Sequence, residues 1–159
     1  VSIDRVISLS KKCNFILRID GLDSAKAVDE AAKQAEVNVN YTLIIDSGLH
    51  RFGVEPEHAA DYAREIAFCK NLIFKGISTH PGHVYGASCK EDLPKYVKDE
   101  RDAIETAVQN LKKAGFFCEI ISSGSTPTFW GAVGDENINI YHPGNYVFLL
   151  ALLHLSTAR

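Results

Sequence analysis

Polar residues and glycines collect directly after four apolar segments of the chain. They are Asp46, Ser47, Gly48, His50 and Arg51; Thr79, His80, Gly82, His83 and Tyr85; Ser122, Ser123, Gly124, Ser125 and Thr126; and His142, Gly144, Asn145 and Tyr146. Hydroxyl, imidazole, amide and guanidinium groups donate hydrogen bonds, and the backbone N–H groups of tight turns bind phosphate oxygens. Four clusters of this kind predict one anionic ligand, held where the apolar segments end.

The turns SSGST (122–126) and HPGNY (142–146) are the strongest candidates for a phosphate site. Each follows a strand-like segment, and Gly144 would let a ligand approach the backbone closely. One hydroxyl-rich turn alone is as typical of an ordinary turn as of a binding site. Two turns on consecutive strands match the phosphate site that many barrels build in their last loops. The pair therefore predicts a shared phosphate site.

Two side chains near these turns could take part in chemistry. His80, in THPGHVYG, could stack on an aromatic ring or transfer a proton near neutral pH, although histidines at strand ends are often only structural. Arg51, in DSGLHRFG, could direct its planar guanidinium at a phenolate or carboxylate, or form a surface ion pair. The remaining histidines lack metal-ligand spacing, so we predict no metal site in these residues.

The segments that must position these residues alternate between strand-like and helix-like patterns. We expect strands at 14–21, 40–48, 72–80, 116–124 and 137–144, and helices at 1–12, 23–37, 56–71 and 90–115. Such alternation is the signature of parallel βα units. At 159 residues the chain is shorter than a complete (β/α)8 barrel, which needs about 250. The sequence therefore predicts an α/β fold that is part of a TIM-type barrel, with about five parallel βα units.

Composition narrows the classes of partner. Hydrophobic residues make up 46% of the chain and charged residues 23%, which is typical of a folded domain. The net charge of -3, without a basic stripe, argues against nucleic acid, and no apolar run is long enough to cross a membrane. Four cysteines without a CxxC pair read as free thiols, with Cys69 on a helix and Cys118 within a strand. We expect a cytoplasmic protein.

Taken in order, DSGLHRFGV, KGISTHPGHVYG, ISSGSTPTFW and HPGNYVF resemble the alanine-racemase-like barrels of the fold-type III pyridoxal-phosphate enzymes. The resemblance is closest to the branch that contains D-threonine aldolase and eukaryotic-type D-serine dehydratase, and it covers about residues 14–148. It implies that residues 1–159 form a partial barrel domain, strands three to seven, that binds pyridoxal 5'-phosphate. The barrel would lack both ends and the C-terminal β domain.

The resemblance also implies roles for individual residues. Arg51 matches the arginine near the phenolic oxygen of the cofactor, and the ring of His80 matches the one that stacks on the pyridine. His142 falls where alanine racemases place an arginine facing the pyridine nitrogen, a departure that argues against racemase chemistry. With Arg51 and His80 as catalytic residues, the implied cofactor-binding set is Arg51, His80, Tyr85, Ser123, Gly124, Ser125, Thr126, His142, Gly144, Asn145 and Tyr146.

The activity implied is that of a lyase acting on 3-hydroxy D-amino acids. The resemblance also implies a homodimer. In the family the Schiff-base lysine would precede Val1 and divalent-metal ligands would follow Arg159, and no lysine here occupies a strand end. We therefore expect the isolated chain to be inactive. Three alternatives stay open: a non-catalytic carrier of pyridoxal phosphate with the same barrel, an amino-acid racemase, and an unrelated sugar-phosphate barrel with His80 and Asp46 as acid and base.

Overall fold

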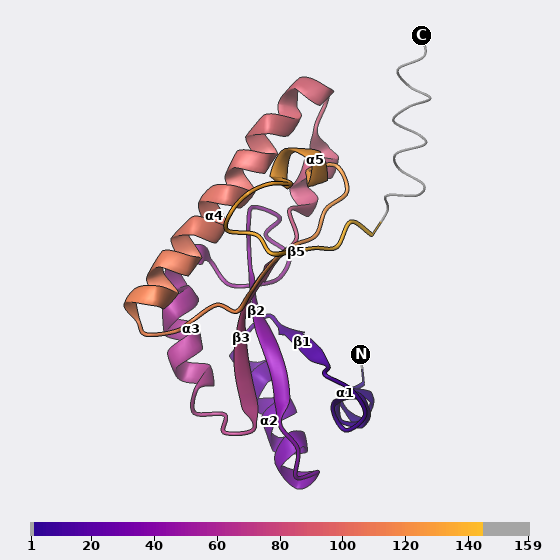
Figure 1. Ribbon diagram of the computed structural model, residues 1–159, viewed down its shortest axis with the longest axis vertical. Helices are drawn as coiled ribbons and strands as arrows, with labels where there is room; N and C mark the ends of the chain where they lie inside the picture. Colours follow the sequence, from indigo (N-terminus) through magenta and orange to yellow (C-terminus); the bar gives the residue numbers. More distant parts are fainter. Residues whose placement is uncertain (1, 145–159) are drawn as a thin grey trace.

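The computed structural model describes residues 2–144, and these form one sheet of five strands. The strands are β1 (Ile16–Ile19), β2 (Val39–Ile45), β3 (Leu72–Thr79), β4 (Ile120–Ser123) and β5 (Ile140–Tyr141). Each strand pairs in parallel with the next one along the chain (Figure 1). Parallel strands in sequential order are the arrangement of a (β/α) barrel, so the predicted fold class is confirmed.

Helices cover one face of this sheet. They are α1 (Ile3–Ser10), α2 (Leu22–Gln34), α3 (Ala59–Ile66), α4 (Leu93–Lys113) and the short α5 (Phe129–Ala132), with 3₁₀ turns η1 (Pro56–His58), η2 (Gly82–Gly86) and η3 (Lys90–Asp92). Helices α2, α3 and α4 pack side by side against β2 and β3 (Figure 1). The opposite face corresponds to the barrel interior, where a hollow of about 150 Å³ is lined by Ile16, Arg18, Thr42, Ile120, Ser122 and Ile140.

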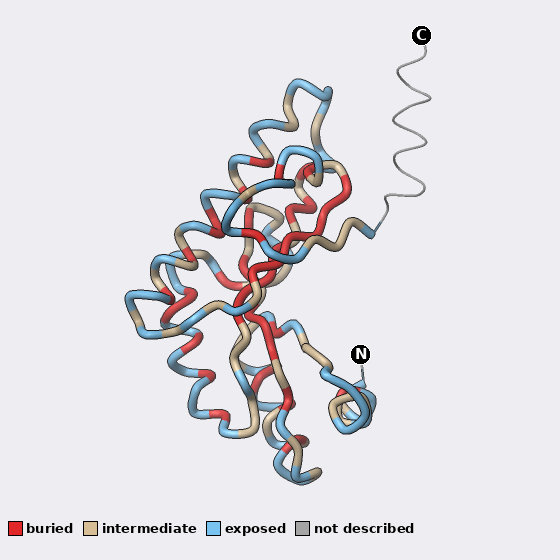
Figure 2. The backbone as a smooth tube through the Cα atoms, in the orientation of Figure 1, coloured by how far each residue is buried: buried red, intermediate tan, exposed pale blue. Residues whose placement is uncertain are grey.

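The hydrophobic core lies between the sheet and the helices. Alternate residues of β2 point to the helices, so Tyr41, Leu43 and Ile45 are all at most 2% exposed. They pack against the apolar stripe of α4, which includes Ile104 and Leu111. Figure 2 shows this buried layer running along the strands and the inner faces of the helices.

A bulge in β3 decides which of its later side chains reach the helices. Tyr41 pairs with Phe74 but Thr42 pairs with Gly76, so Lys75 is the extra residue. Its ammonium group bonds to Glu119 at 2.8 Å. The shift of one residue inverts the alternation beyond it. Ile77 and Thr79 therefore face the helices, and Ser78 faces the barrel interior.

We expect Gly76→Ala to lower the free energy of unfolding by about 3 kcal/mol or more, because backbone strain and overpacking each cost about 1–3 kcal/mol. Gly76 has φ +137°, and a Cβ there would overlap the backbone carbonyl of Ile120 in β4. Urea unfolding measures the loss. Gly21→Ala is the control, since a Cβ at Gly21 meets no atom within 4 Å. Equal stability of the two variants would contradict the bulge.

Two strands begin later in the structure than the sequence predicts. The segment 116–119 is not a strand, because the N–H of Phe116 donates to the carbonyl of Leu111 at 2.9 Å and so closes α4. The side chain of Phe117 is 82% exposed, and Cys118 precedes β4 instead of lying in it. The segment predicted at 137–144 contains only the two residues of β5, since Asn137 belongs to a turn closed by Asp135.

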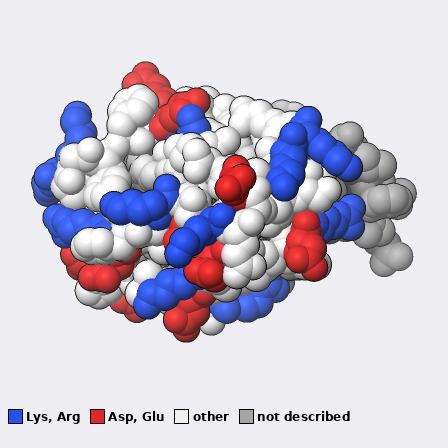
Figure 3. Space-filling model, turned by 90° about the horizontal axis from the view of Figure 1, so that it is seen from below, with Lys and Arg blue, Asp and Glu red and all other residues white. Residues whose placement is uncertain are grey.

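Charged side chains of both signs are interspersed on the face drawn in Figure 3, where lysines and arginines lie beside acidic residues. Among residues 2–144, no helix combines the length and the apolar character needed to cross a membrane.

Candidate functional site

The ends of β3, β4 and β5 meet at one pocket of about 190 Å³. Parallel strands that pair in sequence end at the same edge of a sheet, so the loops that follow them are neighbours. Ser123 pairs with Tyr141, and the N–H of His142 donates to the carbonyl of Ser123 at 2.9 Å. The pocket is lined by His80, Tyr85, Gly124, Ser125, Thr126, His142 and Gly144. The two turns singled out from the sequence thus lie together, while Asn145 and Tyr146 fall outside the described residues.

The absence of a side chain at Gly124 makes room for the ring of His142. The ring of His142 lies against the α-carbon of Gly124, and a Cβ there would overlap the ring. The absence of a side chain therefore lets the end of β5 approach the end of β4.

The ring of His80 is held from two sides. Its Nδ1 contacts the carbonyl oxygen of Gly124. Because a carbonyl only accepts, Nδ1 carries the proton. The ring also stacks with Phe52 at 6.2 Å between centroids and 19° between planes. His80 therefore links β3 to β4 with a fixed ring orientation.

His142 is held by an arginine from the barrel interior. A guanidinium N–H of Arg18, in β1, contacts Nε2 of His142. Since a guanidinium has no acceptor, Nε2 accepts and the proton sits on Nδ1. Burial, and then the charges of Arg18 and His80, lower the pKa of His142 to about 4. His142 is therefore a neutral ring at pH 7 with one N–H.

The titration of His142 should contribute to the pH dependence of the free energy of unfolding. Its pKa falls from 6.5 to about 4 on folding, so the unfolded chain binds more protons between these values. The contribution of His142 to stability is present above pH 6.5 and is lost as the pH falls toward 4. We expect His142→Gln to flatten this part of the stability profile in thermal unfolding. His58→Gln, at an exposed histidine, is the control. An unchanged slope in His142→Gln would refute a neutral His142.

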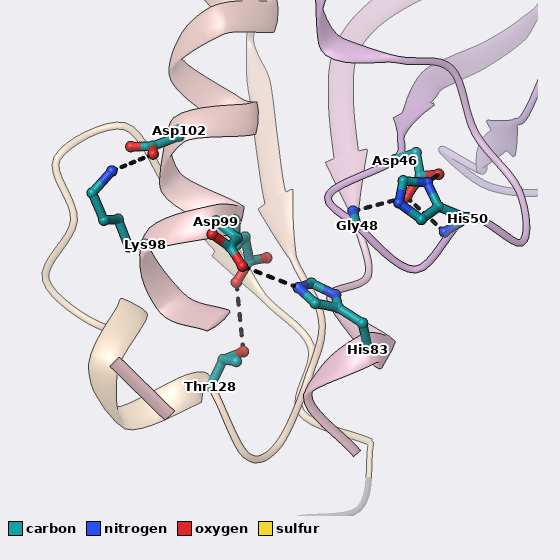
Figure 4. Close-up of polar contacts among 9 residues, drawn as sticks. Asp46, Gly48, His50, His83, Lys98, Asp99, Asp102 and Thr128 are labelled. Carbon is teal, nitrogen blue, oxygen red and sulfur yellow. Dashed lines mark hydrogen bonds and ion pairs between the residues drawn. The ribbon is translucent and has the colours of Figure 1, made fainter. Parts of the chain in front are cut away.

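A second polar cluster forms at the end of β2 and stays apart from the pocket. Asp46 accepts hydrogen bonds from the N–H of Gly48 at 2.9 Å and from the ring of His50 at 3.1 Å (Figure 4). Burial opposes ionisation of Asp46, but these contacts outweigh it and lower its pKa. His83 faces Asp99 across 3.8 Å. Since Asp46 is bonded to His50 and does not line the pocket with His80, an acid and base pair of Asp46 and His80 finds no support.

Two predicted site residues do not line the pocket. The guanidinium carbon of Arg51 lies 4.7 Å from the ring centroid of Phe52. Arg51 thus touches the ring that stacks on His80. The hydroxyl of Ser123 points to the helices, because β4 alternates and Ser122 faces the barrel interior. The cofactor contacts assigned to both residues stay predictions.

One buried charged residue near the pocket was not predicted from the sequence. Glu100, on α4, is fully buried and accepts hydrogen bonds from Thr79 and Ser123. Burial raises its pKa, opposed by these hydroxyls. The signal was present, because Glu100 falls on the apolar stripe between Val97 and Ile104 at helical spacing.

The pocket fits a phosphate group. Among the residues that the structure describes, five side-chain atoms are buried without a hydrogen-bond partner, and two of them, the hydroxyl of Ser125 and Nδ1 of His142, belong to residues that line the pocket. Buried donors of this kind are rare unless a ligand or water completes them. A complete ligand site usually holds about 300–1,000 Å³, so a pocket of 190 Å³ suits one part of a larger ligand. Within residues 2–144, no group of three or more metal-ligating side chains is present.

Sheet order and pocket position define part of a (β/α) barrel domain whose candidate pocket lies at the carboxyl ends of the strands. The chain belongs to the family "Alanine racemase, N-terminal domain", whose model matches residues 3–151. This is the barrel of the fold-type III pyridoxal-phosphate enzymes, so the resemblance read from the motifs is confirmed.

Relatives of this chain include dehydratases and racemases, and an aldolase is among the solved structures with a similar fold. A D-serine dehydratase of Dictyostelium discoideum is 30% identical over 67% of this chain and 29% of its own. A D-threo-3-hydroxyaspartate dehydratase of Delftia sp. is 28% identical over 86% and 36%. A lysine racemase of Thermotoga maritima is 32% identical over 72% and 30%. The structure of D-threonine aldolase from Filomicrobium marinum superposes with a TM-score of 0.83 over 93% of this chain and 41% of its own, at 20% identity. The chain thus spans about a third of the length of these curated relatives.

Proposed function

We propose that this chain forms the phosphate-binding part of a pyridoxal-phosphate-dependent lyase acting on 3-hydroxy D-amino acids, of the D-serine dehydratase or D-threonine aldolase type. The observation that carries the proposal is the meeting of the β4 and β5 ends in one pocket with a buried, unpaired hydroxyl on Ser125. The relatives that are D-serine and D-threo-3-hydroxyaspartate dehydratases support this chemistry.

Different residues of the pocket would contact different parts of the cofactor. When bound, pyridoxal phosphate withdraws electrons and stabilises the electron pair left on Cα of the substrate. Ser125 would donate its hydroxyl to a phosphate oxygen, with Gly124 allowing the close approach. The ring of His80, fixed by Phe52 and Gly124, would lie against the pyridine ring. His142 would present a neutral N–H to the pyridine nitrogen.

Titration of the 159-residue chain with pyridoxal phosphate tests the proposal. We expect a saturable change in absorbance that inorganic phosphate reverses, because both ligands need the same pocket. Ser125→Ala should weaken binding about tenfold, the equivalent of one lost hydrogen bond to a charged group. Ser88→Ala, at an exposed serine, should not. No saturable binding, or equal binding by the Ser125 and Ser88 variants, would count against the proposal.

A racemase is the second candidate, supported by the lysine racemase at 32% identity. The two candidates differ at position 142, where this chain has histidine and alanine racemases have arginine. Product analysis of a catalytically active protein that contains this chain separates them. A dehydratase should release pyruvate and ammonia from D-serine, and an aldolase should cleave D-threonine into glycine and acetaldehyde. A racemase should convert one enantiomer into the other and release none of these products.

A further inference from the structure

Glu100 lies directly behind the pocket. Its side chain comes from the sheet-facing side of α4 and is 0% exposed. One carboxylate oxygen accepts from the hydroxyl of Thr79 at 2.6 Å and from that of Ser123 at 2.7 Å. The other accepts from the hydroxyl of Thr128 at 3.5 Å, and Figure 4 shows Thr128 pointing toward α4. One carboxylate thus gathers hydroxyls from three separate segments.

Each of the three hydroxyl residues lies within two positions of a residue that lines the pocket. Thr79 ends β3 and precedes His80, and Ser123 ends β4 and precedes Gly124. Thr128 follows the pocket residue Thr126 by two positions and begins the turn into α5. The position of the Glu100 carboxylate is therefore coupled to three segments that line or adjoin the pocket.

The carboxylate is not explained by packing. Its neighbours on the same stripe of α4, Val97 and Ile104, are buried and apolar. Burying a carboxylate costs free energy that an apolar side chain in the same place avoids. The partners of Glu100 are neutral hydroxyls, which repay this cost only in part. The feature that an apolar residue could not supply is the fixed spacing of the three segments.

We propose that Glu100 is a positioning residue of the pocket, whose carboxylate holds the ends of β3 and β4 and the start of α5 at the spacing that the phosphate of pyridoxal phosphate requires. This inference rests on the proposed function. Glu100 lies behind the strand ends, so it acts through Thr79, Ser123 and Thr128 and not by contact with the ligand.

The chemistry of the three contacts predicts different outcomes for two substitutions. Glu100→Gln keeps the amide oxygen as acceptor for Thr79 and Ser123, and the hydroxyl of Thr128 can rotate to accept from the amide nitrogen. Glu100→Ala removes all three contacts and leaves a cavity. Glu105→Ala is the matched control, because Glu105 is an exposed residue of the same helix bonded to Gln109.

The experiment compares pyridoxal phosphate, pyridoxal and inorganic phosphate as ligands of the full chain and its variants. For Glu100→Ala we expect the dissociation constants of pyridoxal phosphate and of inorganic phosphate to rise at least tenfold, with that of pyridoxal unchanged. Glu100→Gln should stay within threefold of the wild type, and so should Glu105→Ala. Circular dichroism verifies the fold of each variant. Rescue by glutamine and the confinement to ligands with a phosphate are effects that simple destabilisation would not produce.

A folded Glu100→Ala that binds pyridoxal phosphate like the wild type would overturn the inference, as would an equal loss of affinity for pyridoxal. If Glu100→Ala does not fold, Thr79→Val removes one hydroxyl without changing the size of the side chain. It should raise the dissociation constant of pyridoxal phosphate at least threefold, and no change would overturn the inference. Failure of the wild-type chain to bind either phosphate ligand is a separate result that removes the proposed function and this inference together.

Discussion

Replacement of Gly124 by alanine should strongly weaken the binding of pyridoxal phosphate to this chain. The new methyl group would occupy the space of the His142 ring. A side chain can rotate away where a backbone cannot, so the fold should survive. The ring would then lose its contact with Arg18 and the pocket would lose one wall. We expect the dissociation constant to rise at least 100-fold, about 2.8 kcal/mol of binding free energy.

The absorbance titration measures this loss, and circular dichroism verifies the fold. Gly86→Ala is the matched control, because a Cβ at Gly86 meets no atom within 4 Å. It should bind like the wild type. A Gly124→Ala chain that binds as tightly as Gly86→Ala would mean that the ends of β4 and β5 do not approach as described.

The second large effect is on turnover. The 159-residue chain should convert neither D-serine nor D-threonine at a detectable rate, even when pyridoxal phosphate is bound. Catalysis of this kind needs a lysine beside the cofactor, and no lysine lines the pocket of the described residues. Lys75 is bonded to Glu119, Lys90 lines a different hollow, and residues 145–159 contain no lysine.

Assays for pyruvate, acetaldehyde and ammonia measure turnover, with the D-serine dehydratase of Dictyostelium discoideum as the positive control. Binding without turnover would separate the role of this part of the barrel, which holds the phosphate, from the part that supplies the lysine. Turnover by the 159-residue chain alone would contradict that division.

Much of the fold follows from local pattern. The strands β2 and β3 lie within a few residues of their predicted segments, because runs such as YTLII are apolar on both faces. Local pattern does not predict the start of β4, because Phe116 and Phe117 are residue types that favour strands. A backbone hydrogen bond from Phe116 to Leu111 at the end of α4 decides the boundary. Such a contact is not visible in hydrophobic pattern.

The sequence predicts which loops form the site but not the contacts of their individual side chains. Sequential parallel strands must end at one edge, so the meeting of Ser125 and Gly144 could be foreseen. The direction of Ser123 could also have been read, because residues of a strand alternate between faces. The cluster at Asp46 lay beyond this reasoning, since its separation from the pocket depends on how His50 folds back onto it.

Glu100 shows a different limit. In the segment KDERDAIE it looks like one of several surface charges, and only its place on the apolar stripe marks it as buried. Its partners come from residues 79, 123 and 128, so no local pattern joins them.

A crystal structure of the chain with pyridoxal phosphate tests the central claim most directly. The ends of β4 and β5 should hold one dianion between them, with the phosphate beside Ser125 and Gly144 and within hydrogen-bond distance of the Ser125 hydroxyl. The contradicting result is a phosphate bound elsewhere, above all in the larger hollow lined by Lys90, Lys98 and Arg101, with the pocket at Ser125 filled only by water.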